Sequence, residues 1–186
     1  MIREEFHMAT ATSLTIDDFE HLPADVVRHR ELVDGELIDV SGNTPRHNII
    51  RDRLTSRLMA WAEARAAGMV IAEQEYDFLG NAHGPDVSFF GPEKQTLLDL
   101  YKRVQRFVPD LAIEVASASD TYDSLLRKKE RYRRAGTTEV WLISAENAEI
   151  AIYGPDGDRI LRAGDTLSSE VLPGFALTVN DLFRGL

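Results

Sequence analysis

Apolar residues recur at helical spacing along residues 46–66 and predict the longest helix of the chain. Four of them define one face of that helix: Ile50, Leu54, Leu58 and Trp61. Gly68 follows and is the expected stop, because glycine readily adopts the left-handed conformation that ends a helix. We therefore expect this helix to cover a core with one apolar face.

Three β-rich segments follow the helix, at residues 69–78, 85–90 and 111–116. A second helix is expected over residues 120–135, with Asp120 or Ser119 as its cap and Gly136 as its terminator. Residues 139–144 then form a continuous apolar run, which is typical of a buried strand. The predicted order is helix, three strands, helix, strand.

Shorter elements are expected on both sides of this core. Thr15 and Asp18 resemble a helix-capping arrangement and predict a helix over 16–22, after which Asp34-Gly35 marks a β-hairpin. Residues 93–107 suggest a short helix between two strands. A second hairpin at 149–163, a short strand segment in the tail and a turn of helix at 180–183 would extend the sheet. The fold class is therefore α/β, with a mixed central β-sheet flanked by helices.

Composition fits one ordinary globular domain. The chain has 186 residues and is 44% hydrophobic, which is enough to bury a core without disulfides or a structural metal. No window approaches the roughly 18 apolar residues of a membrane span, and the start lacks the apolar stretch of a signal peptide, so we expect a cytoplasmic protein. Since cysteine is absent, a metal would be held by oxygen or imidazole, which favours Mg²⁺ or Mn²⁺.

The charge of the chain is uneven. The net charge of −10 argues against coating of nucleic acid by bulk attraction, yet residues 127–134 carry six basic residues against one acid. Arg46, Arg51, Arg53 and Arg57 gather on the long helix. These runs are equally typical of solvated helix faces.

Two acids and one base carry the candidate chemistry. Asp86 begins one predicted strand, Glu114 lies inside another, and Lys128 lies on the following helix. Carboxylates from neighbouring strands can share a hard divalent cation, and a nearby lysine can stabilise negative charge or orient a water molecule. This order predicts a metal-dependent phosphodiesterase site.

Each of these residues has a plainer interpretation. Asp86 after a proline is common turn chemistry, and Glu114 could pair with an arginine, although an acid in a buried strand is costly unless paired or metal-bound. Lys128 and Lys129 both lie on or beside the apolar face of their helix, so either could be the site lysine. Glu31 and Glu36 flank the hairpin and could lie near the site, but we expect them to be exposed acids of the hairpin strands.

The ordered motifs resemble the Uma-type putative restriction endonuclease family, a bacterial branch of the PD-(D/E)XK nuclease-like superfamily. They are, in order, TIDDF at 15–19, ELVDGEL at 31–37, His47 heading the long helix, GPDVSFF at 84–90, PDLAIEVASASD at 109–120, Lys128 with Tyr132, Gly136, EVWLIS at 139–144 and LPGFALTVNDLF at 172–183. The resemblance covers nearly the whole chain. It implies a restriction-endonuclease-like core at about 46–144, with N-terminal (1–45) and C-terminal (145–186) extensions in one domain.

The resemblance also implies roles. Asp86 and Glu114 would be metal ligands, the Val115 carbonyl a possible backbone ligand, and Lys128 the catalytic lysine. Ala116 stands where the wider nuclease pattern has a lysine, so the lysine would have moved to the next helix, with Lys129 as the competing choice.

The family resemblance also implies an auxiliary residue, a cofactor and partners. His47 could contact metal, water or phosphate, although a histidine at a helix start is more often a cap or packing residue. The implied function is Mg²⁺- or Mn²⁺-dependent hydrolysis of DNA by a homodimer. Alternatives are a non-catalytic module that binds nucleic acid or protein, and a phosphodiesterase acting on small nucleotides.

Overall fold

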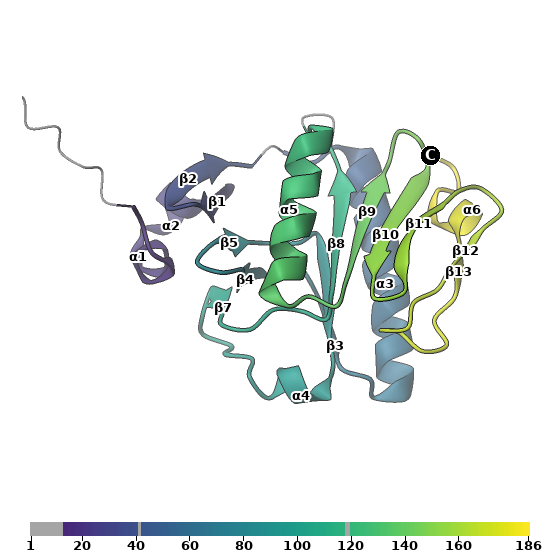
Figure 1. Ribbon diagram of the computed structural model, residues 1–186, viewed down its shortest axis with the longest axis horizontal. Coiled ribbons are helices and arrows are strands. Elements are labelled where there is room, and N and C mark those ends of the chain that lie inside the picture. The colour runs from purple at the N-terminus through teal and green to yellow at the C-terminus, as the bar shows by residue number, and fades with distance from the viewer. Residues whose placement is uncertain (1–12, 41, 118–119) are drawn as a thin grey trace, which may run out of the picture.

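A six-stranded mixed sheet forms the centre of the molecule (Figure 1). The computed structural model describes residues 13–40, 42–117 and 120–186. The strand order is β11-β10-β9-β8-β6-β3, with all neighbours antiparallel except β8 and β9. The bounds are β3 (Met69–Ala72), β6 (Val87–Phe90), β8 (Leu111–Ala116), β9 (Glu139–Ser144), β10 (Glu149–Gly154) and β11 (Gly157–Leu161).

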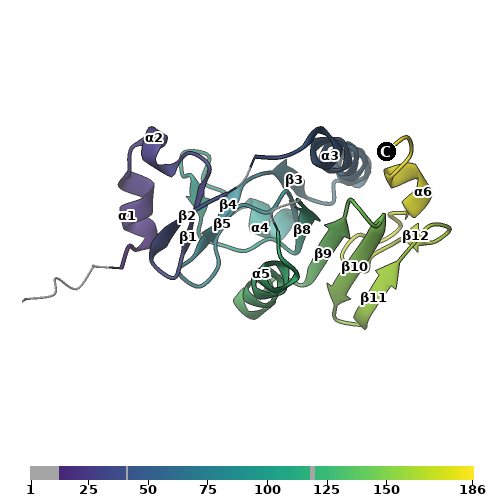
Figure 2. The ribbon, with the colours of Figure 1, turned by 90° about the horizontal axis from the view of Figure 1, so that it is seen from above.

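The two long helices, α3 (Pro45–Arg65) and α5 (Tyr122–Ala135), lie on opposite faces of this sheet (Figure 2). The buried face of α3, with Ile50, Leu54 and Leu58, packs on strand residues that include Ile113. On the other face, Tyr132 of α5 packs among alternate strand residues. Because β8 and β9 are parallel, α5 is the crossover between them. For the elements of the central sheet, the expected order of helix, three strands, helix, strand is confirmed.

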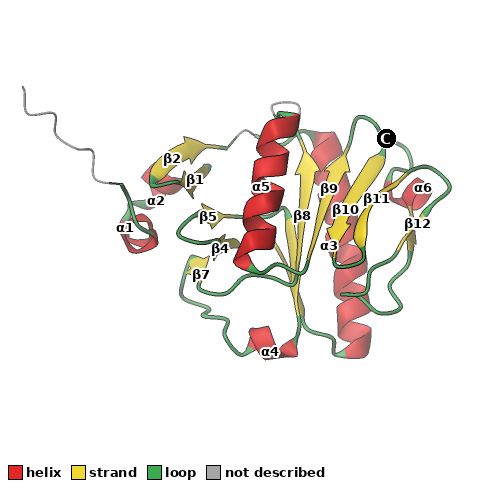
Figure 3. Ribbon diagram, in the orientation of Figure 1, coloured by secondary structure: helices red, strands yellow, loops and turns green. Residues whose placement is uncertain are grey.

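A second, five-stranded sheet lies beside the first and has the order β2-β1-β5-β4-β7 (Figure 3). Its strands are β1 (Arg30–Val33), β2 (Glu36–Asp39), β4 (Glu75–Asp77), β5 (Ala82–His83) and β7 (Val104–Gln105). The predicted hairpin is confirmed, as β1 pairs with β2 around Asp34 and Gly35. The helices α1 (Ile16–His21) and α2 (Ala24–Val27) contribute Phe19 and Val27 to its small core.

Of the C-terminal elements, only the hairpin extends the central sheet as expected, and the expectation that the tail strand would also extend it is wrong. The hairpin of β10 and β11 extends it at one edge. The strands β12 (Thr166–Leu167) and β13 (Leu177–Thr178) form a separate pair, followed by α6 (Val179–Leu182), whose Leu182 joins the core under α3. The final helical turn therefore begins one residue earlier than predicted.

The prediction of one strand over residues 69–78 is wrong. The segment is divided between β3, which belongs to the central sheet, and β4, which belongs to the second sheet. Glu73 adopts a left-handed conformation with φ of 56° between them, and its N–H donates to the Asp86 carbonyl. Apolar residues occupy 69–72 and return at Tyr76 and Phe78, and the polar residues 73–75 between them mark the bend.

Other boundaries also differ from the sequence-based expectations. Residues 93–107 contain only the short helix α4 (Pro92–Gln95) and then β7, so most of that segment is not helical. The cap of α5 is Thr121 rather than Asp120, and Ser119 lies outside the described residues. The helix α3 ends before Gly68, with Ala66 in the left-handed conformation. None of the helices within the described ranges combines the length and apolarity that a membrane crossing requires.

Candidate active site

Asp86 directly precedes β6, the strand that pairs with β8. Its Oδ2 atom accepts a 2.7 Å hydrogen bond from the backbone N–H of Val115 on β8. The same oxygen lies 3.1 Å from Nε2 of His47. Asp86 is therefore held by two elements through one carboxylate oxygen. Among the described residues, Oδ1 has no hydrogen-bond partner.

His47 is buried in the first turn of α3, and its backbone N–H donates to the Thr44 cap. Burial is the largest effect and lowers the pKa of His47, but the hydrogen bond with Asp86, the negative charge of Asp86 and a hydrogen bond with Asn48 together outweigh it, so the pKa lies above its ordinary value. The histidine thus contacts an acid of the site in addition to packing at the helix start.

Glu114 lies on the face of β8 that α5 covers, and it is buried. Its Oε1 accepts a 2.6 Å hydrogen bond from the Tyr132 hydroxyl, and its Oε2 lies 3.6 Å from the Lys128 ammonium. Lys128 and Tyr132 are one helical turn apart on α5, so both reach the same carboxylate. The expectation that this strand acid would need a partner is met by a lysine and a tyrosine.

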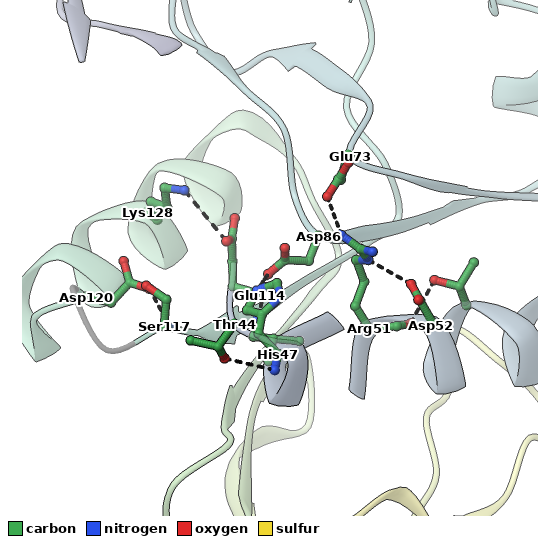
Figure 4. A network of polar contacts seen from close by, with 12 residues as sticks. Thr44, His47, Arg51, Asp52, Glu73, Asp86, Glu114, Ser117, Asp120 and Lys128 are labelled. Atoms are coloured by element: carbon green, nitrogen blue, oxygen red, sulfur yellow. Dashed lines mark hydrogen bonds and ion pairs between the residues drawn. The ribbon is translucent and has the colours of Figure 1, made fainter. Parts of the chain in front are cut away.

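The two candidate lysines point to different places. The Lys128 ammonium lies between Glu114 and Glu31, whereas Lys129 lies 3.4 Å from Glu130 and 4.8 Å from the centre of the Tyr153 ring. Only the first of the two contacts the acids of the site. Figure 4 shows Lys128, Glu114, Asp86 and His47 next to one another.

Burial and the two neighbouring acids perturb the ionisation of Glu114. Burial is the largest effect and raises its pKa, the charge of Lys128 lowers it, and repulsion from Asp86 and Glu31 raises it again, to about 8. For Lys128, burial lowers the pKa, but the charges of Glu114 and Glu31 outweigh it and raise the pKa above its ordinary value. The ammonium therefore stays charged while Glu114 takes up protons readily.

A cleft of about 650 Å³ opens at this point between the two sheets. Its lining includes Asp86, Glu114, Val115, Lys128 and His47. A substrate phosphate entering the cleft would therefore meet both carboxylates and the ammonium.

The donor set fits a hard divalent cation held by few protein ligands. Within the described ranges, no three histidine, aspartate or glutamate side chains form a ready-made metal-binding group. Mg²⁺, however, is usually bound through one or two carboxylates, with water and substrate phosphates completing the shell. Asp86 and Glu114 supply two. Since the N–H and C=O of an extended residue point to the same edge, the Val115 carbonyl is directed towards the Asp86 side.

The roles of two residues that contact this site were not predicted from the sequence. The prediction that Glu31 is an exposed strand acid is wrong, since its exposed fraction is 8% and it contacts Lys128, whereas Glu36 is exposed. Tyr132 was named with Lys128 as a motif of the family resemblance, but no role at the site was assigned to it. Its spacing of four residues from Lys128 was the one available signal, because residues four apart share a helix face.

The chain is similar to a solved structure and to one protein family. A solved structure, described as a putative nuclease belonging to DUF820 from Anabaena variabilis, superposes with a TM-score of 0.79 at 18% identity, covering 91% of this chain and 97% of that one. That likeness shows the fold. No curated protein matches the chain. The model of the Uma2 family, described as "Putative restriction endonuclease", matches residues 16–180, and the chain belongs to this family.

Proposed function

We propose that the protein is a divalent-metal-dependent nuclease that hydrolyses DNA phosphodiester bonds. The observation that carries this proposal is the convergence of Asp86, Glu114 and Lys128 in one cleft, from β6, β8 and α5. The family description supports nucleic acid as the substrate. A site of this kind fits phosphoryl chemistry, since two acids can bind a cation and an ammonium can stabilise an oxyanion.

We assign a separate role to each residue of the site. Asp86 and Glu114 would hold Mg²⁺ or Mn²⁺, with the Val115 carbonyl as a further oxygen donor. His47 and the Val115 N–H fix the orientation of the Asp86 carboxylate through Oδ2. A cation bound there would polarise a phosphoryl oxygen and lower the pKa of an attacking water molecule. Lys128 is placed to stabilise the negative charge that develops on the phosphate or to orient that water.

Cleavage of supercoiled plasmid DNA tests this proposal. We expect the purified protein to nick the plasmid with Mg²⁺ or Mn²⁺ but not with EDTA. Asp86→Asn and Glu114→Gln should abolish nicking. Glu63→Gln on the exposed face of α3 is the matched control and should leave it unchanged. Single-stranded DNA and RNA in parallel reactions define the substrate class.

Each of two alternative functions predicts a different experimental result. A protein that binds no divalent ion and leaves every substrate intact would be a non-catalytic binding module, for which the net charge of −10 is the best support. Turnover of small nucleotides without salt-sensitive affinity for long DNA would indicate a small-nucleotide phosphodiesterase. The expected homodimer stays a prediction, which sedimentation of the purified protein would test.

A further inference from the structure

We propose that Glu31 is a positioning residue of the site, held by His83 and Arg131, and that it fixes the Lys128 ammonium beside Glu114. This inference rests on the proposed nuclease function for its catalytic consequence. It assigns a role to an acid of the N-terminal hairpin, which lies outside the core elements that carry Asp86, Glu114 and Lys128.

A chain of contacts leads from the site to the surface. The Lys128 ammonium lies 3.1 Å from Oε1 of Glu31, and the other oxygen, Oε2, lies 2.9 Å from Nδ1 of His83. Nε2 of His83 lies 2.9 Å from Nη1 of Arg131, whose Nη2 donates to the Asp34 carboxylate. Both oxygens of Glu31 are therefore engaged, one by the lysine and one by the histidine.

The donor and acceptor roles along this chain are fixed by chemistry. An ionised carboxylate only accepts hydrogen bonds, so Nδ1 of His83 carries the proton. A guanidinium only donates, so Nε2 of His83 accepts from Arg131 and the imidazole is neutral. Because Arg131 already occupies Nε2, the ring cannot turn without losing both contacts. Glu31 therefore keeps its full negative charge and one orientation.

Lys128 is shared between two acids but lies nearer to Glu31. Its ammonium is 3.1 Å from Glu31 and 3.6 Å from Glu114. Without Glu31, the ammonium would be free to pair with Glu114 alone and to occupy the oxygen that a cation needs. With Glu31 in place, Lys128 stays beside the cleft and keeps a counter-charge when Glu114 binds a cation.

Burial supports a specific role for this acid. Glu31 and His83 have exposed fractions of 8% and 1%, whereas Glu36 on the paired strand β2 is exposed. A buried carboxylate is costly unless it is paired and hydrogen-bonded. Glu31 is paired with the site lysine and hydrogen-bonded to a buried histidine. Glu36 is therefore a matched control on the same hairpin.

A double-mutant cycle in the plasmid-nicking assay tests the inference. We expect Glu31→Gln to lower kcat about 10- to 100-fold with little change in KM, which is the usual effect of losing a partner that orients a site residue. Glu36→Gln should not change kcat. In a Lys128→Met background, Glu31→Gln should cause no further loss, because Glu31 acts through the lysine. An equal loss in both backgrounds, or no loss in the wild-type background, would overturn the inference.

A spectroscopic readout separates this inference from the proposed function. A partly buried ammonium held between two carboxylates gives a ¹H–¹⁵N correlation for its Nζ group, which Lys128→Met would assign by its disappearance. We expect this signal in the wild type and in Glu36→Gln, and its loss in folded Glu31→Gln. If the wild-type protein proves inactive on every substrate, the proposed function fails, yet loss of the signal still supports the positioning role. Retention of the signal in Glu31→Gln contradicts it.

Discussion

The Tyr132 hydroxyl donates a 2.6 Å hydrogen bond to Oε1 of Glu114, which leaves Oε2 for Lys128. Both partners come from one face of α5, so the helix fixes the two oxygens of a buried strand acid at the same time. Both oxygens of Glu114, a residue that lines the cleft, are therefore held by α5. The orientation of Glu114 therefore depends on α5 as much as on β8.

Tyr132→Phe should remove the hydrogen bond to Glu114 while the aromatic ring keeps its place in the core. The buried Oε1 atom would lose its donor, so we expect the free energy of unfolding to fall by about 1–3 kcal/mol. Mn²⁺ affinity should also fall, by roughly 10- to 100-fold. Urea denaturation and calorimetric titration measure these effects. Tyr101→Phe is the control, since Tyr101 is 96% exposed, and equal effects of the two changes would contradict the assigned contact.

Lys128→Met should abolish most of the nuclease activity, whereas Lys129→Met should not. Lys128 contacts Glu114 and Glu31, while Lys129 lies over the Tyr153 ring. We expect kcat to fall roughly 10²- to 10³-fold for the first change, the usual cost of losing one group that stabilises an oxyanion. A larger loss in Lys129→Met would assign the site lysine to the neighbouring position. Circular dichroism of both variants would check that they remain folded.

Metal affinity should depend on pH through Glu114. Its pKa is raised from 4.5 to about 8, mainly by burial and by repulsion from Asp86. A cation needs the ionised carboxylate, so Mn²⁺ affinity should rise about tenfold for each pH unit below that value and level off above it. Titrations at several pH values measure this dependence. A flat profile would contradict the perturbed carboxyl.

The same shift determines how stability changes with pH in the metal-free protein. The folded state holds the Glu114 proton more tightly than the unfolded state does. The protonated carboxyl therefore adds to the free energy of unfolding in full below about pH 4.5, and this stabilisation is lost as pH rises through about 8. Glu114→Gln should remove this part of the decline. Denaturation of both proteins across that window measures the difference. Parallel declines in both proteins would show that other groups cause it.

Gly68→Ala should destabilise the connection between α3 and β3. Gly68 has φ of +133°, and an added Cβ would lie 2.1 Å from the Phe90 carbonyl oxygen. Gly80 also has positive φ, at +84°, but an added Cβ there would meet nothing within 4 Å. We expect Gly68→Ala to cost about 1–3 kcal/mol more than Gly80→Ala, since both share the backbone strain and only one has the clash. Equal stabilities would contradict the close approach.

The core elements could be predicted from sequence because their signals are local. The helical spacing of Ile50, Leu54 and Leu58 and the apolar run of β9 describe each element's own buried face. The split of residues 69–78 could not be predicted in this way. It depends on β3 pairing with β6 and β4 pairing with β5, and these long-range pairings assign one β-rich segment to two different sheets.

The candidate site was predicted only in part for a similar reason. Asp86 and Glu114 follow from their places beside and within strands, since an acid in a buried strand needs a partner. Glu31 alternates with apolar residues like any half-exposed strand acid, and its burial arises only because α5 and His83 pack against it. Neither contact has a signature in the sequence of the hairpin.

Calorimetric titration with Mn²⁺ tests the proposed metal site directly, because the proposed nuclease function requires Asp86 and Glu114 to share a cation. We predict that the wild-type protein and the Glu63→Gln control bind Mn²⁺, and that folded Asp86→Asn and Glu114→Gln each lose this binding. Binding that persists in both variants, or its absence from the wild-type protein, would contradict the assignment of this cleft as a metal-dependent active site.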